Sequence, residues 1–212
     1  MLGIKSLKET VLSSFNDENP GEVDKYINLI RDSLKSTNSK FHSYTLLLII
    51  SLVAYHLYAN HYLREISVLS FRISDDDFIR KWYLVIPSII YVVTASMGYL
   101  RVFQQESIEW ILARYRPKEY ASGIYRLTFP SNYILGIDIM RRQKSTTTKI
   151  IAYIVTLPLA FGSIIAPMWY ILWAYSNTFE EIGGNISLVT SFSASSILLI
   201  CGLGIIIKSQ KI

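Results

Sequence analysis

Three histidines are the side chains in this sequence best suited to acid–base chemistry or metal binding near neutral pH. His42, His56 and His61 all lie within or beside an apolar run that begins at Ser43. His56 and His61 are five residues apart, whereas two ligands on one face of a helix are three or four residues apart. We therefore interpret the histidines as interfacial side chains and expect no metal site.

Other arrangements of residues that carry catalysis are missing from the sequence. It contains no HExxH zinc motif, no GxSxG nucleophile motif and no glycine-rich loop for a phosphate or a dinucleotide. Its single cysteine, Cys201, excludes both a pair of cysteine ligands and an intramolecular disulfide. We expect a protein that is not an enzyme and that uses no cofactor and no metal.

Long apolar runs dominate the sequence. Of its 212 residues 51% are hydrophobic, and four runs approach or exceed the roughly 20 residues that cross a bilayer as a helix. No Asp, Glu, Lys or Arg lies in the middle of these runs, which argues against an ion-coupled transporter. We predict an all-α membrane protein with four transmembrane helices, at about Ser43 to Asn60, Trp82 to Phe103, Ile150 to Tyr175 and Ser187 to Ile207.

The basic residues predict how the chain crosses the membrane. Six lie in the first 40 residues and nine lie from Arg101 to Lys149, whereas the loop between the third and fourth spans has none. Because short cytoplasmic loops retain Lys and Arg, we expect both termini and the middle segment in the cytoplasm. The predicted parts are a cytoplasmic amphipathic segment 1–42, a membrane domain 43–207 that includes the basic cytoplasmic segment 104–149, and a cytoplasmic tail 208–212.

The N-terminal segment has the apolar spacing of two amphipathic helices, separated by residues 16–21. Asn19, followed by Pro20 and Glu22, is a good start signal for the second helix. The apolar stripe of each helix needs a cover. We expect the chain's own cytoplasmic segments to provide it, with a partner protein or the membrane surface as alternatives.

Span two is expected to continue as one helix from about Asp75 to Arg116, interrupted only by Pro87. Beyond the membrane it carries an apolar stripe, which we interpret as a docking surface for a partner or for lipid. A basic cluster further along is interpreted as a contact with anionic lipid headgroups, with an acidic partner as the alternative and no direct nucleic-acid binding expected. The stripe is Ile108, Ile111, Leu112 and Tyr115, and the cluster is Arg141, Arg142 and Lys144.

Two further segments have signals of irregular structure. The first outer loop alternates roughly in polarity from Glu65 to Ser74, which predicts a short strand or β-hairpin. The third span contains Pro158 and Pro167, which predict a kink or a local unwinding of its helix. A kink made for packing is the simpler interpretation, and a transporter-like site is the alternative.

The fourth span has small residues at a spacing of four, a pattern that lets helices approach closely. We interpret this small-residue ridge as a packing surface within one chain or between copies. The polar lining of a pore is the alternative, because the ridge is rich in hydroxyl groups. The ridge consists of Ser187, Thr190, Ser191, Ala194, Ser195 and Gly202.

In size and span layout the chain resembles the membrane subunit of the Kiwa phage-defence systems of bacteria. The resemblance covers the whole chain but rests on layout: the amphipathic N-terminus, the span with Pro87, the basic segment Arg101 to Lys149 and the short acidic outer loop at Glu180. It implies a homo-oligomer, a tetramer, in the bacterial inner membrane that senses phage attack and recruits a DNA-binding cytoplasmic effector. It assigns no role to any individual residue.

The sequence thus leads to two functional hypotheses. The first is a non-enzymatic, homo-oligomeric membrane sensor or anchor that presents residues 1–40 and 101–149 to a cytoplasmic protein. It accounts for the amphipathic helices and for the missing catalytic groups. The alternative is a pore-forming effector or channel, in which the assembled fourth spans let ions or water through.

Overall fold

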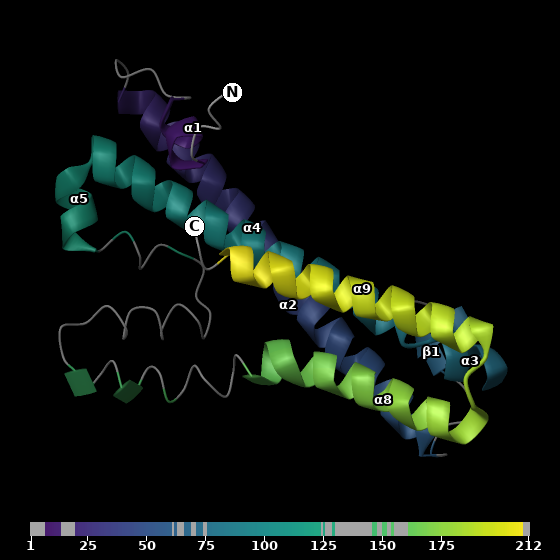
Figure 1. Ribbon diagram of the computed structural model, residues 1–212. Coiled ribbons are helices and arrows are strands. Elements are labelled where there is room, and N and C mark those ends of the chain that lie inside the picture. Colours follow the sequence, from purple (N-terminus) through teal and green to yellow (C-terminus); the bar gives the residue numbers. More distant parts are fainter. Residues whose placement is uncertain are drawn as a thin grey trace, which may run out of the picture.

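The computed structural model of the chain is dominated by helices (Figure 1). It describes residues 7–13, 20–60, 62, 66–68, 71–73, 76–123, 125, 129, 146–147, 150–151, 154 and 161–209. The helices are α1 (Leu7–Ser13), α2 (Pro20–Ala59), α3 (Asp76–Trp82), α4 (Val85–Tyr115), α5 (Pro117–Ser122), α8 (Ala166–Ile182) and α9 (Ile186–Ser209), with a π-helix η2 (Phe161–Ile165) and the strands β1 (Ile66–Val68) and β2 (Phe71–Ile73).

Three helical segments in the described part of the chain are long and apolar enough to cross a membrane. They are Gly21–Ala59 in α2, Ile79–Tyr115 across α3 and α4, and Ile186–Ser209 in α9. These segments contain almost all of the predicted first, second and fourth spans. By length and composition the chain is therefore an integral membrane protein.

The predicted third span is not among these three segments. The helix described in that region, α8, begins at Ala166 and ends at Ile182 rather than at Tyr175. Pro167 is the second residue of α8, so its missing N–H falls where the helix changes from π to α geometry, and Gly183 follows the end of α8 with a φ of 71°. A π-helical stretch, η2, directly precedes α8, while Pro158 lies outside the described residues.

Helix α2 joins two elements that the sequence analysis treated separately. The second amphipathic helix and the first span form one helix of 40 residues, which begins at Pro20 as predicted. At a rise of 1.5 Å per residue it is about 60 Å long, roughly twice the thickness of the hydrocarbon core of a bilayer. Nearly half of α2 is therefore in excess of the length needed to cross the hydrocarbon core.

The predicted helix of span two is divided into α3 and α4. The break falls at Tyr83 and Leu84, and α4 begins at Val85, so that Pro87 occupies its first turn instead of interrupting its middle. At its other end α4 stops at Tyr115, and Pro117 begins α5. The predicted extent of this helical region, from about Asp75 to Arg116, is confirmed, whereas the break lies at Tyr83 and Leu84 and not at Pro87.

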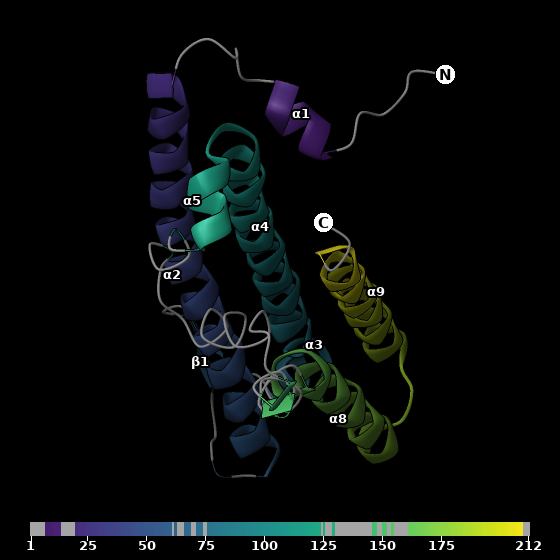
Figure 2. The same ribbon diagram turned by 90° about the vertical axis from the view of Figure 1, so that its left-hand side faces the viewer.

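Helices α2 and α4 are antiparallel and lie side by side over most of their lengths, and α9 packs along α4 (Figures 1 and 2). Helix α8 turns back into α9 through residues 183–185, and the Asn185 side chain accepts a hydrogen bond of 2.8 Å from the Leu188 N–H at the start of α9. We call the end of the molecule that holds the strands, α3 and this turn the hairpin end. The opposite end, which we call the α5 end, consists of α1, α5, residues 20–36 of α2 and 105–115 of α4.

At the hairpin end the two short strands pair antiparallel. Ile66 lies opposite Ile73 and Val68 lies opposite Phe71. Both strands fall within the loop from Glu65 to Ser74. The adjoining Trp82 donates a hydrogen bond of 2.8 Å from Nε1 to Ser187 Oγ, which fixes α3 against the start of α9.

Candidate functional site

Two hydrophobic clusters follow one another along the α2–α4 pair, and buried polar side chains separate them. The larger cluster fills the space between α2, α4, α8 and α9, and the smaller one fills the α5 end. We call the polar residues between them the junction layer. It consists of Thr37, Asn38, Arg101, Gln104 and Ser107.

Arg101 is the charged member of the junction layer. Its side chain lies in the α2–α4 interface, only 5% of the residue is exposed, and the guanidinium carbon is 5.0 Å from the centroid of the Phe41 ring. A cation over an aromatic face is stabilised by about 0.5–2 kcal/mol. Among the described residues its Nε and Nη1 atoms have no hydrogen-bond acceptor.

Gln104 lies one helical turn from Arg101 on the same face of α4. Its Nε2 donates a hydrogen bond of 2.8 Å to Ser33 Oγ on α2, while its buried Oε1 has no donor among the described residues. The junction layer thus holds two unused donors and one unused acceptor. Sequence reasoning counted Arg101 only as the first basic residue of a long segment, although it is the sole charged residue from Trp82 to Gln105.

The apolar stripe predicted to dock a partner or lipid is covered within the chain. Ile108 and Ile111 are 0% exposed and Leu112 is 1% exposed, because they pack against α2. Tyr115 lies half-buried at the edge of the same cluster. The buried part of the stripe therefore offers no free surface. The expectation that the chain's own segments cover the second amphipathic helix matches this packing of α2 on α4. Its partners on α2 are Val23, Ile27 and Leu34.

Two ion pairs of Arg116 lie at the α5 end. Arg116, between α4 and α5, donates from Nη2 to Asp24 Oδ2 at 2.7 Å and from Nη1 to Glu119 Oε1 at 3.1 Å. The three side chains are partly exposed to solvent, so the pairs stabilise the fold by no more than about 1 kcal/mol each. Their effect is to fix the angle at which α5 leaves α4.

The small-residue ridge of α9 is largely buried inside a single chain. Ser191 is 0% and Ser195 1% exposed, and Gly202 is buried against the Tyr91 ring of α4. Thr190 is exposed, and its hydroxyl donates to the Ile186 carbonyl 2.7 Å away. Packing within one chain is thus the observed use of the ridge, in which Ala194 and Ser187 are half-buried.

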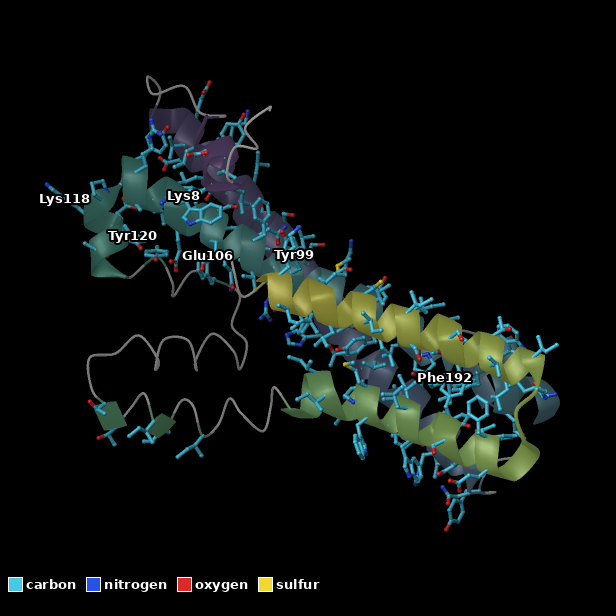
Figure 3. The ribbon with its side chains drawn as sticks, viewed as in Figure 1. Lys8, Tyr99, Glu106, Lys118, Tyr120 and Phe192 are labelled. Atoms are coloured by element: carbon cyan, nitrogen blue, oxygen red, sulfur yellow. The ribbon has the colours of Figure 1, made fainter. Side chains whose placement is uncertain are left out.

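Hydroxyl groups connect the helices of the larger cluster. Tyr175 OH and Ser195 Oγ are 2.9 Å apart and join α8 to α9, whereas Tyr55 OH and Thr178 Oγ1 are 3.2 Å apart and join α2 to α8. Phe192 fills the space between α8 and α9 beside them (Figure 3). Such bonds hold helices together in an apolar medium and contribute about 0.6 kcal/mol each. They include no carboxylate or imidazole that would move a proton.

The structure describes two of the three histidines, His42 and His56, both on α2. His56 Nδ1 lies 3.2 Å from Tyr170 OH, which links α2 to α8, and His42 is exposed. His61 is outside the described residues. In the parts of the chain that the structure describes, no group of three or more His, Cys, Asp or Glu side chains could hold a metal ion.

The predicted basic cluster, Arg141, Arg142 and Lys144, lies outside the described residues.

The fold and the site define an α-helical integral membrane protein in which α2 and α4 build a second, smaller core beyond their apolar parts. No protein-family model, curated protein or solved structure matches the chain. The resemblance to the Kiwa membrane subunit therefore stays a prediction based on span layout.

Proposed function

We propose that the protein is a non-enzymatic, homo-oligomeric sensor or anchor of the bacterial inner membrane that recruits a cytoplasmic protein. In this proposal both termini and the α5 end are cytoplasmic, the hairpin end is outside, and the region 150–175 with α8 forms a fourth span. The α5 end would be the surface that the cytoplasmic protein meets.

The observation that carries the proposal is the continuity of α2 and α4. Each helix runs unbroken from the larger hydrophobic cluster, through the junction layer, into the smaller one. Packed helices move as rigid bodies, because close-packed side chains transmit displacement. A shift or rotation of the spans would therefore reach the α5 end as a change in the angle between α2 and α4.

The arrangement of the loops favours the proposed orientation. Of the two loops that were expected outside, the strands β1 and β2 of the first and the turn at 183–185 of the second lie at the hairpin end (Figure 1). The α5 end holds basic residues of the N-terminal segment and of the segment that follows Arg101. Lys and Arg retained on one side of the spans are typical of the cytoplasmic side.

The surroundings of α8 favour a fourth span. Trp169, Leu172 and Trp173 are exposed on α8, and Tyr175 packs into the larger cluster. Exposed aromatic side chains on one face and buried contacts on the other are typical of a helix at the lipid boundary. With α8 as a span, α9 returns to the side of the membrane on which α2 begins.

Purification of the tagged full-length protein from its native host in mild detergent, with the mass of the intact complex, tests the proposal. We expect a homo-oligomer that carries a stoichiometric cytoplasmic protein. The double charge reversal Lys25→Glu and Lys118→Glu, at exposed positions of the α5 end, should release that protein, whereas Tyr62→Ala, at an exposed position after α2, should not. Figure 3 shows Lys118 on α5.

Ion flux measured in liposomes distinguishes the sensor from the pore. Ser191 and Ser195 are buried in a single chain, so a pore would have to form between copies from other faces of the helices. Flux through the purified protein alone, without any bound cytoplasmic protein, would contradict the sensor and favour a channel. An oligomer that conducts nothing and releases its partner on charge reversal would support the sensor.

A further inference from the structure

Arg101 has no counter-charge within the apolar stretches of the three long helices, and the nearest acidic residues of α4, Glu106 and Glu109, lie further toward the α5 end. Residues 33–60 of α2, 82–105 across α3 and α4, and 186–209 of α9 contain no aspartate or glutamate at all. The guanidinium contacts the Phe41 ring, and its Nε and Nη1 atoms find no acceptor among the described residues. A buried cation without a counter-charge is costly, because the interior replaces none of the water that it loses.

The position of Arg101 along the helices indicates which anions can reach it. Val92 Cα lies 3.7 Å from where a Cβ of Gly202 would be, so the parallel helices α4 and α9 place Lys208 near the level of residue 98. Tyr99 lies at this level in Figure 3, near the end of α9. Lys40 is exposed on α2, next to Phe41. Arg101, Lys40 and Lys208 therefore lie at a similar level along their helices, where the apolar stretches end.

We propose that Arg101 binds the phosphate group of an anionic membrane lipid at this boundary. Nε and Nη1 are buried in the free chain, so the guanidinium has to turn toward the bilayer before the phosphate oxygens accept from it in charge-assisted hydrogen bonds. Gln104 Oε1, one turn away and likewise buried, would accept from a headgroup hydroxyl after the same movement, so phosphatidylglycerol offers a partner to both groups. Lys40 and Lys208 add attraction for the same charge.

This lipid site does not depend on the proposed recruitment of a cytoplasmic protein. It requires only that α2, α4 and α9 cross a bilayer. A bound lipid would fix the junction layer, which lies between the spans and the α5 end, and would thus make the packing of the two clusters sensitive to lipid composition. The partner experiment above and the lipid experiment below can fail independently.

The test uses the purified full-length protein in nanodiscs or in detergent with added lipid. Retention of phosphatidylglycerol is measured by native mass spectrometry, with phosphatidylcholine as the neutral lipid. Arg101→Gln should weaken retention about tenfold or more, as expected for loss of a charge-assisted bidentate contact. Arg101→Lys should keep part of the affinity, and Lys8→Gln, exposed on α1, should leave lipid retention unchanged.

Thermal unfolding shows whether the counter-charge of Arg101 is a lipid phosphate or a carboxylate elsewhere in the chain. In neutral detergent Arg101→Gln should raise Tm by about 2–4 °C, because an uncompensated charge is removed. Phosphatidylglycerol should then raise Tm of the wild type but not of this variant. A lower Tm for Arg101→Gln in neutral detergent would overturn the proposal, since it means that the chain supplies the counter-charge.

Two other results would also overturn it. Equal retention of phosphatidylglycerol by the wild type and Arg101→Gln would show that the lipid binds elsewhere. Stabilisation of the wild type by millimolar inorganic phosphate in detergent, with no effect of phosphatidylglycerol, would assign the site to a soluble phosphate compound instead. Loss of retention in Arg101→Gln alone, with partial retention in Arg101→Lys, would establish the site.

Discussion

At the scale of single residues, α9 illustrates how the absence of a side chain sets the distance between two helices. A Cβ atom built on Gly202 would lie 2.6 Å from Cε1 and 2.7 Å from Cδ1 of Tyr91, and the Tyr91 ring is itself buried. Two residues further on, Gly204 has open space around it. Both glycines lie on α9, but of the two only Gly202 is in close contact with α4.

This difference gives a matched pair of variants. Gly202→Ala should destabilise the protein by about 1–3 kcal/mol, because the buried Tyr91 ring has to move. Gly204→Ala should leave stability unchanged or raise it slightly, since alanine favours a helix over glycine by about 1 kcal/mol. Unfolding in detergent micelles by circular dichroism measures both, and equal effects of the two substitutions would contradict the packing of α9 on α4.

At the scale of elements, the α5 end depends on contacts between α2 and α4 that lie about 80 residues apart in the sequence. Val23 and Ile27 on α2 cover Ile108 and Ile111 on α4, and the Arg116 to Asp24 ion pair lies at the tip. An isolated helix in water is marginal even at 12–15 residues, so the projecting part of each helix needs the other.

Removal of one side chain from this contact should loosen both helices. Leu112→Ala should destabilise the α5 end by about 2–5 kcal/mol, through lost burial and the cavity left behind. Hydrogen exchange should accelerate in residues 20–34 and 105–115 while the apolar parts of α2 and α4 keep their protection. Ala113→Ser, at the neighbouring exposed position, is the control, and unchanged exchange in Leu112→Ala would contradict the observed packing.

At the scale of the whole molecule, the chain has a hairpin end and an α5 end on opposite sides of its apolar helices (Figure 2). The hairpin end collects the strands, α3 and the turn that leads into α9. The α5 end collects α1, α5 and the ion pair of Arg116. Three helices are long and apolar enough to cross a membrane, and the proposed function places the two ends in different compartments.

Labelling of single cysteines tests which end lies outside. In a Cys201→Ser background, Glu180→Cys near the hairpin end should react with a membrane-impermeant maleimide on intact cells. Lys118→Cys on α5 should react only after the membrane is permeabilised. Both residues are exposed, so failure to react reflects the membrane and not burial. The reverse labelling pattern would contradict the proposed cytoplasmic location of the α5 end.

The sequence by itself determined the class of protein and much of its helical content, because apolar runs and helix stop signals are local properties. It predicted the start of α2 at Pro20 and the end of α4 before Pro117, and three of its four spans coincide with long apolar helices. It did not predict that α2 is continuous. No residue between Lys40 and Ser43 ends a helix, but none of them shows that the helix continues either.

Only the tertiary structure decided how the faces of these helices are used. The stripe at Ile108 has the same periodicity whether a partner or the chain's own α2 covers it, and the ridge at Ser191 has the same spacing in a packed helix and in a pore. Burial depends on which residue lies opposite, and that is set by the register between distant helices. For the same reason the sequence showed Arg101 as one basic residue among several, whereas the structure places it in a buried layer without a counter-charge.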